Sequence, residues 1–172
     1  MNDFGFYPAC ENEGTVFGAE RPGYPFNVVS QDKVREWITF MRKQGITRVC
    51  CLLSCEQLHY YKDGLLTLYS AEFGEDNTCW APVEDFYLCD AELLKEKILP
   101  FLKESDAKRE KVVVHCSAGI GRTGLILAAW LVSGRGFSVE EALSAVKKTG
   151  RNPLEAVEYG TASKRELYDL LL

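Results

Sequence analysis

The feature that most constrains this chain is a short loop between two apolar segments. Three consecutive valines, Val112–Val114, predict a buried strand, and the apolar run from Gly121 to Ser133 predicts a helix. The segment HCSAGIGRTG, residues 115–124, joins the two. In such a loop the backbone N–H groups point inward beside the positive end of the helix dipole, which favours a bound anion. The sequence therefore predicts an anion-binding loop between a strand and a helix.

Strand and helix patterns alternate along the rest of the chain. Apolar runs predict further strands at residues 15–17, 47–53 and 78–83. Ser30, Ser138 and Ser163 are placed as helix N-caps, and four helices in a row are expected after residue 120. Strands that are each followed by a helix form parallel sheets. We therefore expect an α/β fold with a central, largely parallel sheet of about four to five strands flanked by helices.

The size and composition of the chain limit its organisation. Its 172 residues, 47% of them hydrophobic, fit one domain over residues 1–172 that buries its own core. Residues 1–14 are rich in Gly, Asn and Glu and predict an irregular N-terminal arm. The net charge of −5 argues against a nucleic-acid-binding surface, which is usually basic.

The loop carries side chains suited to a phosphate ester. Cys116 opens it, where the inward N–H groups, the helix N-terminus and Arg122 all favour the thiolate. The planar guanidinium of Arg122, six residues further on, can hold two phosphate oxygens. Gly119 and Gly121 let the loop curl tightly. Alternatively, the loop could be a tight strand-to-helix turn in which Cys116 is only structural. The presence of Arg122, Thr123 and the glycines at these positions makes a chance match to an anion-binding loop implausible.

This segment fits a Cys-x5-Arg-Ser/Thr signature and resembles the cysteine-based protein phosphatase superfamily, which includes tyrosine-specific and dual-specificity phosphatases. The resemblance implies that Cys116 is the nucleophile that forms a phosphocysteine, and that Arg122 clamps the phosphate and stabilises the transition state. It also implies that the Thr123 hydroxyl helps the thiolate leave, and that His115 orders the loop. The backbone amides expected to complete the phosphate cradle are those of Ser117, Ala118, Gly119, Ile120, Gly121 and Arg122. No metal or cofactor is implied.

The leaving group needs a proton, and the superfamily supplies it from an Asp on a loop about 30 residues before the nucleophile. Asp85, in the segment APVEDF, lies 31 residues before Cys116 and directly follows the strand expected around residue 80. The same Asp would later activate water. Asp90, Glu84 and Asp76 are rival carboxylates, and a solvated loop carboxylate is the alternative for Asp85 itself.

Two departures from the pattern of the larger superfamily members indicate which branch of the superfamily this chain resembles. Glutamine occurs only at positions 31, 44 and 57, so the water-positioning Gln of larger members has no counterpart after Cys116. The tyrosine-bearing recognition loop of those members is also missing from residues 1–60. Both absences favour the compact, dual-specificity branch. The resemblance implies a phosphatase of phosphotyrosine in protein substrates, with phosphoserine and phosphothreonine as further candidates.

Two other functions stay open. The same chemistry could act on a small phosphate ester such as a sugar or inositol phosphate, or the domain could bind phosphopeptides without turnover. The loop interior, Ser117, Ala118 and Ile120, is neutral, which argues against a polyphosphorylated lipid. Degenerate members of the superfamily usually lose the nucleophile or the arginine, and this chain keeps both.

The cysteines and the N-terminus bear on compartment and regulation. There are seven cysteines and no Cys-x-x-Cys motif, and Met1-Asn2-Asp3 lacks the positive region of a signal peptide. We expect a cytoplasmic monomer without a membrane span.

Cys55, or Cys51 as the second choice, is a candidate redox partner that would form a disulfide with Cys116. The alternative is that this cysteine is only a structural thiol.

Overall fold

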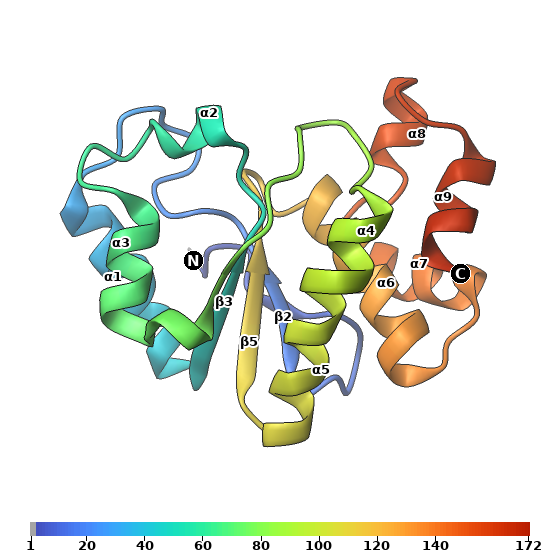
Figure 1. Cartoon of the computed structure of the whole chain (residues 1–172), viewed down its shortest axis with the longest axis horizontal. Helices are drawn as coiled ribbons and strands as arrows, with labels where there is room; N and C mark the ends of the chain where they lie inside the picture. Colours follow the sequence, from blue (N-terminus) through green and yellow to red (C-terminus); the bar gives the residue numbers. More distant parts are fainter. Residues whose placement is uncertain (1–2) are drawn as a thin grey trace.

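Five strands form one sheet in the order β1–β2–β5–β3–β4 (Figure 1). The computed structural model describes residues 3–172, so that Met1 and Asn2 lie outside the described residues. The strands are β1 (Tyr7–Pro8), β2 (Val16–Ala19), β3 (Ile46–Cys51), β4 (Thr78–Trp80) and β5 (Lys111–His115). β1 runs antiparallel to β2, and the other neighbours are parallel. The expected α/β fold with a largely parallel sheet is confirmed.

Helices connect the strands and continue after the last one. They are α1 (Gln31–Lys43), α2 (Cys55–Leu58), α3 (Leu65–Phe73), α4 (Ala91–Leu93), α5 (Leu99–Lys108), α6 (Gly121–Arg135), α7 (Val139–Lys148), α8 (Glu155–Tyr159) and α9 (Lys164–Leu171). A 3₁₀ turn, η1 (Glu75–Asn77), precedes β4, and a π-helical segment, η2 (Leu94–Ile98), links α4 to α5. The Oγ atoms of Ser30, Ser138 and Ser163 accept from backbone N–H groups at the starts of α1, α7 and α9, as expected.

The sheet is buried on both faces because alternate residues of its strands point to opposite sides. Val113 of β5 packs with α1 and α3, which cover one face. Val112 and Val114 pack with α6 and the other C-terminal helices on the opposite face. Burial on both sides explains why β5 reads as a continuous run of valines rather than as an alternating pattern.

Residues 3–14 form turns and irregular backbone around one short strand. Tyr7–Pro8 forms the edge strand β1, paired with Gly18 and Phe17. Glu13 is buried and accepts hydrogen bonds from Arg135 of α6 at 2.8 and 3.0 Å. This ion pair joins the N-terminal segment to α6. The strand β1 was not expected from the sequence, because two residues are too few to show an alternating pattern.

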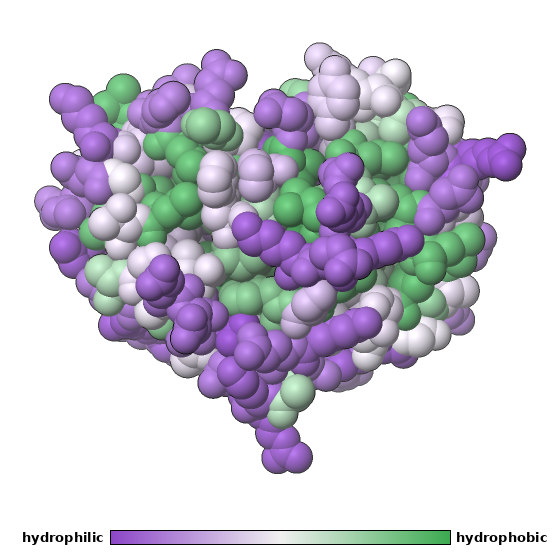
Figure 2. Space-filling model, viewed as in Figure 1, coloured by the Kyte–Doolittle hydropathy of each residue, from purple (hydrophilic) through white to green (hydrophobic). Residues whose placement is uncertain are grey.

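The four parallel strands all end at the same edge of the sheet. The loops after Ala19, Cys51, Trp80 and His115 therefore converge there, which is where ligands bind in open parallel sheets. Figure 2 shows this upper edge notched between the α2 side and the α8 side, whereas hydrophilic side chains crowd the lower tip below α5. Within residues 3–172 no helix is both long and apolar enough to cross a membrane.

Candidate active site

The loop from Cys116 to Arg122 lies at the carboxyl end of β5, and Cys116 is only 2% exposed. Gly119 adopts φ +74° and touches the end of β2, where an added Cβ would lie 2.6 Å from the carbonyl carbon and oxygen of Ala19. A side chain at this position would meet both backbone strain and a backbone clash. The glycine thus allows the loop to curl against the sheet.

The second loop glycine makes room for a carboxylate. A Cβ on Gly121 would lie 1.6 Å from Oε2 of Glu155, the first residue of α8. Burial and the charge of Asp85 raise the pKa of Glu155. Glu155 therefore stands beside the loop, and its position gave no signal in the sequence.

His115 is held between the loop and the core. Its Nδ1 lies 3.0 Å from the carbonyl oxygen of Cys116, and its Nε2 lies 2.9 Å from the hydroxyl of Tyr69. A carbonyl only accepts, so Nδ1 carries the proton and Nε2 accepts from Tyr69. Burial lowers the pKa of His115 to about 4, which keeps the ring neutral. The geometry suits a residue that fixes the loop backbone.

Arg122 is buried and oriented by three oxygens. Its Nη1 donates to Oε1 of Gln57 at 2.8 Å and to the carbonyl of Val83 at 2.9 Å. Its Nη2 lies 3.3 Å from Oδ1 of Asp85, so the expected acid is brought to the expected clamp. Within the described residues, Nε of Arg122 and Oγ1 of Thr123 are buried without a hydrogen-bond partner. These unpaired groups are free to meet a ligand.

The rival carboxylates lie elsewhere. Asp90 is the N-cap of α4, where its Oδ1 accepts from the N–H of Leu93 at 3.0 Å. Asp76 lies within η1 before β4, and Glu84 is exposed. Among the candidates named from the sequence, Asp85 has the contact with Arg122.

Two further arginines surround the loop. Arg21 is buried, and its Nε donates to Oγ of Ser117 at 3.0 Å. Arg151 is also buried and donates to the carbonyl of Gly119. Within residues 3–172 neither of them forms a salt bridge, so Asp85 is the carboxylate paired with this group of three arginines. The excess of buried positive charge suits a dianionic phosphate.

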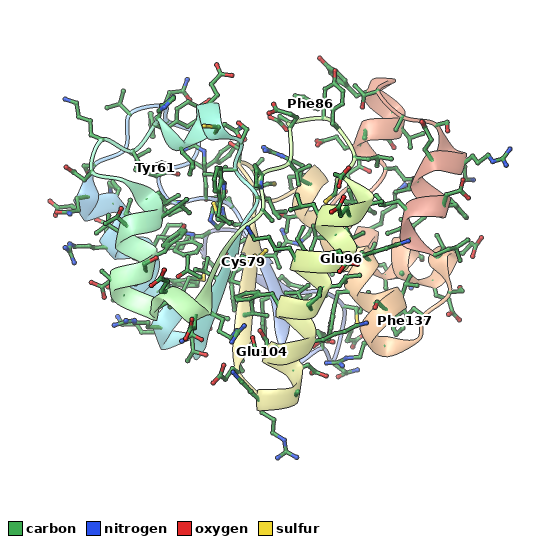
Figure 3. All side chains as sticks on the ribbon, viewed as in Figure 1. Tyr61, Cys79, Phe86, Glu96, Glu104 and Phe137 are labelled. Carbon is green, nitrogen blue, oxygen red and sulfur yellow. The ribbon has the colours of Figure 1, made fainter. Side chains whose placement is uncertain are left out.

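Aromatic rings flank the loop on two sides. Phe86, next to Asp85, stacks on Tyr159 of α8 with ring centroids 4.4 Å apart, and Figure 3 shows it pointing toward α8. On the other side, the guanidinium of Arg21 lies over the rings of Tyr60 and Tyr24, at 4.8 and 5.7 Å from their centroids. Aromatic rings thus lie near the loop through Asp85 on one side and through Arg21 on the other.

The two candidate redox partners occupy different environments. Cys55 is exposed at the start of α2. Cys51 is buried at the end of β3, where it pairs with His115, the residue before Cys116. Burial raises the pKa of Cys51 to about 12.

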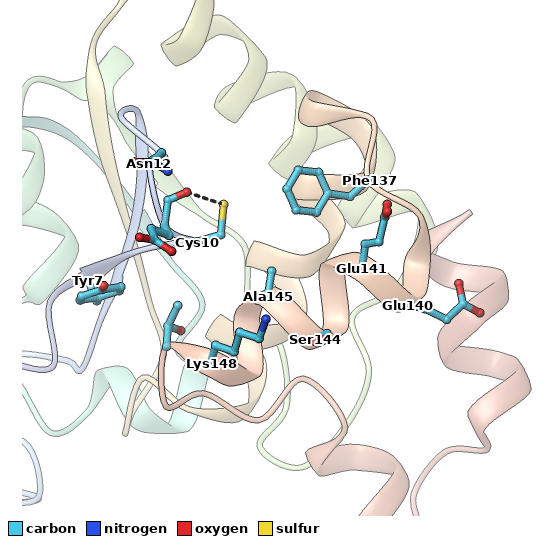
Figure 4. A pocket seen from close by; sticks show the side chains of 11 residues that line it. Tyr7, Cys10, Asn12, Phe137, Glu140, Glu141, Ser144, Ala145 and Lys148 are labelled. Carbon is cyan, nitrogen blue, oxygen red and sulfur yellow. Dashed lines mark hydrogen bonds between the residues drawn. The ribbon is translucent and has the colours of Figure 1, made fainter.

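A separate hollow of about 670 Å³ lies between the N-terminal segment and α7 (Figure 4). Its walls include Tyr7, Cys10, Phe137 and Lys148, and no residue of the 116–122 loop lines it. Within residues 3–172 no three His, Cys, Asp or Glu side chains gather as metal ligands. The chemistry-bearing residues are concentrated at the loop.

Sequence reasoning missed Gln57, Arg21 and Glu155. A signal existed for Gln57, because Ser54-x-x-Gln57 is a capping box and the structure forms it. That signal predicts a helix start and says nothing of Arg122.

Known phosphatases are similar to parts of this chain. Human dual specificity protein phosphatase 5 is 35% identical over 69 residues, which are 40% of this chain and 18% of that protein. The tyrosine-protein phosphatase yvh1 of Schizosaccharomyces pombe is 33% identical over 81 residues, or 46% and 24%. The chain thus spans less than a quarter of the length of these two relatives.

Solved structures match over nearly the whole chain. Tk-PTP in its active form has a TM-score of 0.68 at 27% identity, covering 95% of this chain and 98% of that one. Kinase associated phosphatase has a TM-score of 0.69 at 21% identity, covering 88% and 86%, and shows the fold alone. The family described as "Dual specificity phosphatase, catalytic domain" matches residues 30–161. The chain therefore belongs to the dual specificity phosphatase catalytic domain family, within the cysteine-based phosphatases that its loop resembles.

Proposed function

We propose that this chain is a protein phosphatase that hydrolyses phosphotyrosine, and also phosphoserine and phosphothreonine, through a phosphocysteine intermediate. The observation that carries the proposal is the convergence of Cys116, Arg122 and Asp85 at the end of β5. A nucleophile, a phosphate clamp and a proton donor are the groups that phosphomonoester hydrolysis requires.

The orientation of Arg122 suggests how phosphate binds. Gln57 and Val83 occupy Nη1, which leaves the edge formed by Nε and Nη2. That edge presents two parallel N–H groups to two oxygens of a phosphate. Asp85 now interacts with Nη2, so phosphate binding would release this carboxyl toward the leaving group.

Two proton transfers follow. In the first step, Sγ of Cys116 forms a bond to phosphorus while the ester oxygen leaves, taking its proton from Asp85. In the second, water attacks phosphorus, Asp85 takes its proton, and Cys116 leaves as a thiolate. The unpaired hydroxyl of Thr123 can donate to that departing sulfur. His115 fixes the loop, and the loop amides bind the equatorial oxygens.

The substrate preference rests on the aromatic rings near the loop. The rings of Phe86 and Tyr159 on one side, and Tyr24 and Tyr60 on the other, favour an aryl phosphate over a sugar phosphate. Hydrolysis of a small sugar or inositol phosphate by the same residues is the second candidate. Binding without turnover is the third, and the presence of Cys116, Arg122 and Asp85 opposes it.

One panel of assays separates the three. Phosphate release is measured with EDTA at mildly acidic pH from phosphotyrosine, phosphoserine and phosphothreonine peptides and from an inositol phosphate. We expect turnover of the phosphopeptides, fastest for phosphotyrosine, that persists in EDTA and disappears in Cys116→Ser. Faster hydrolysis of the inositol phosphate would select the second candidate, and binding without release would select the third.

We also propose a monomer that works on phosphorylated proteins in the cytoplasm, without binding nucleic acid or membrane. The seven cysteines are all free, as is usual in a reducing compartment, and the charge of −5 opposes nucleic acid. Sedimentation at micromolar concentration, with and without added DNA or anionic vesicles, tests this. One species of about 19.4 kDa in every mixture is expected, and a dimer or co-sedimentation would contradict it.

We further propose that a second cysteine protects Cys116 by forming a disulfide under oxidation. The pairing of Cys51 with His115, next to Cys116, supports Cys51, and Cys55 is the alternative. Peroxide treatment and peptide mapping of the wild type, Cys51→Ser and Cys55→Ser test the idea. A bond from Cys116 that disappears only in Cys51→Ser is expected, and oxidation of Cys116 to sulfinic acid alone would remove the proposal.

A further inference from the structure

Arg151 lies beneath the loop from Cys116 to Arg122, here called the phosphate loop, between this loop and the sheet. It is 6% exposed, and a Cβ on Gly18 of β2 would lie only 2.8 Å from its Cζ. Its Nη1 donates to the carbonyl of Gly119, and its Nη2 donates to the carbonyl of Gly5 at 2.8 Å. Within residues 3–172 its Nε has no hydrogen-bond partner. The side chain is therefore fixed and almost wholly removed from water.

The charge of Arg151 has no carboxylate to balance it in the part of the chain that the structure describes. Arg48 differs in this respect, because it is also buried but pairs with Glu104 at 2.8 Å and with Glu110 at 3.4 Å. A buried charge without a counter-ion is strongly destabilising. Carbonyl oxygens alone supply only dipoles, so a negative group is expected close to Arg151.

In the loop over residues 116–122, which Arg151 contacts at Gly119, Cys116 is the residue whose side chain can become an anion. Burial lowers the pKa of Arg151 to about 10, and Cys116 is the ionisable group whose charge acts in the opposite direction. Arg151 also bonds the carbonyl of Gly119 inside the same loop. Arg151 is thus attached by a hydrogen bond to the same loop that Cys116 opens.

We propose that Arg151 is a positioning residue that acts as the counter-ion of the Cys116 thiolate from beneath the phosphate loop. Arg122 and Arg151 then have different roles. The Nε and Nη2 groups of Arg122 bind the phosphate oxygens, whereas Arg151 stabilises the thiolate of the nucleophile. The inference rests on the proposed function, since it assigns a role in preparing that nucleophile. Ionisation transfers the thiol proton to water and involves no other reactant.

Alkylation of Cys116 measures the thiolate without any turnover. The neutral reagent iodoacetamide reacts with the thiolate form, and peptide mapping distinguishes Cys116 from the other six cysteines. In Arg151→Met we expect the pH at half-maximal alkylation to rise by about one unit, which slows the reaction about tenfold at pH 6. Arg151→Lys keeps the charge and should recover most of the rate.

The matched control is Arg165→Met, which removes an arginine that is 91% exposed and 3.8 Å from Asp169. It should leave the alkylation profile unchanged. A folded Arg151→Met with the wild-type profile would overturn the proposal. Weaker inhibition by inorganic phosphate with that same profile would show instead that Arg151 serves the phosphate. If Arg151→Met does not fold, Arg151→Gln carries the same test.

A double-mutant cycle gives a second readout that does not depend on reactivity. The free energy of unfolding at pH 7 is measured for the wild type, Arg151→Met, Cys116→Ser and the double variant. If the two charges interact, Cys116→Ser alters the effect of changing Arg151, so the two effects are not additive. Additive effects would contradict the proposal, even in a chain that shows no phosphatase activity.

Discussion

The amide of Gln57 is a small group with a large influence on the site. Its Oε1 accepts from the N–H of Ser54 at 3.2 Å and from Nη1 of Arg122 at 2.8 Å. One oxygen therefore joins the start of α2 to the phosphate clamp. Because the amide is neutral, it orients the guanidinium without cancelling its charge.

Replacing Gln57 should disturb Arg122 and leave the fold largely intact. For Gln57→Ala we expect kcat/KM on a phosphotyrosine peptide to fall on the order of tenfold to a hundredfold, because the guanidinium loses an anchor. Gln57→Glu should instead weaken inhibition by inorganic phosphate, since a second negative charge adjoins Arg122. The control is Gln44→Ala, at an exposed glutamine. Equal kinetics for Gln57→Ala and the wild type would contradict the role.

His115 predicts a particular dependence of stability on pH. Its pKa is about 4 when folded and ~6.5 when unfolded, so the unfolded chain binds the extra proton between these values. The free energy of unfolding should therefore fall as the pH drops from 6.5 to 4, by about 1.4 kcal/mol per pH unit from this group. Urea titrations compare the wild type with His115→Gln.

The variant should show a flatter dependence, and the matched control His59→Gln, at the exposed histidine, should follow the wild type. Parallel curves for the wild type and His115→Gln would show that the ring is not held neutral.

Site residues that are contiguous in the sequence could be predicted, whereas the distant residues that orient their side chains could not. Cys116 to Thr123 lie in one segment, and the superfamily resemblance predicts the acid about 30 residues before Cys116, which makes Asp85 the candidate. The contact between Gln57 and Arg122 crosses 65 positions, and that between Arg21 and Ser117 crosses 96. No local pattern encodes such pairs, because they form only when the loops after different strands meet at one edge of the sheet.

Among the elements, α8 holds the loop that carries Asp85. Phe86 has φ +65°, an unfavourable angle for a residue other than glycine, and its ring stacks on Tyr159. The hydroxyl of Thr161 donates to the carbonyl of Phe86. These two contacts compensate for the strained backbone beside Asp85.

Loosening that contact should impair proton donation by Asp85. For Tyr159→Ala we expect a several-fold lower kcat on phosphotyrosine peptides, because Asp85 is less well placed. An aryl phosphate whose leaving group needs no proton should be affected less. Tyr7→Ala, at an exposed ring on β1, is the control. An equal loss on both substrates would show that the contact does not serve Asp85.

Elements were predictable where their patterns were long, and less so at their ends. The strand expected over residues 78–83 ends at Trp80, although the N–H groups of Ala81 and Val83 still donate to Cys51 and Leu52. Pro82, between them, has no N–H to continue the ladder. The predicted strand was too long because residues 81–83 are apolar, although they no longer pair as a regular strand.

For the whole molecule, we propose that residues 1–172 form a single domain. Hydrophobic clusters cover both faces of one sheet, with Trp37 in one cluster and Trp130 in the other. Because both clusters share the same strands, neither can unfold without exposing the sheet to water.

Unfolding should therefore be one cooperative transition. A variant with Trp37→Phe and Trp80→Phe keeps Trp130, and a variant with Trp80→Phe and Trp130→Phe keeps Trp37, so tryptophan fluorescence reports the two faces separately while circular dichroism reports the helices. Within each variant, the fluorescence and circular dichroism transitions should share a single urea midpoint. Separate midpoints for the two probes would mean that the faces unfold independently and that the single-domain proposal is wrong.

The central claim is that Cys116 attacks phosphorus with Asp85 as the acid. Its most direct test is to quench the reaction of a ³²P-phosphotyrosine peptide with acid within milliseconds and to map the labelled protein by mass spectrometry. We predict a phosphoryl group on Cys116 in the wild type, accumulation of that species in Asp85→Asn with a substrate that needs no acid, and no label in Cys116→Ser. Phosphate release that proceeds without a label on Cys116, or that persists in Cys116→Ser, would contradict the account.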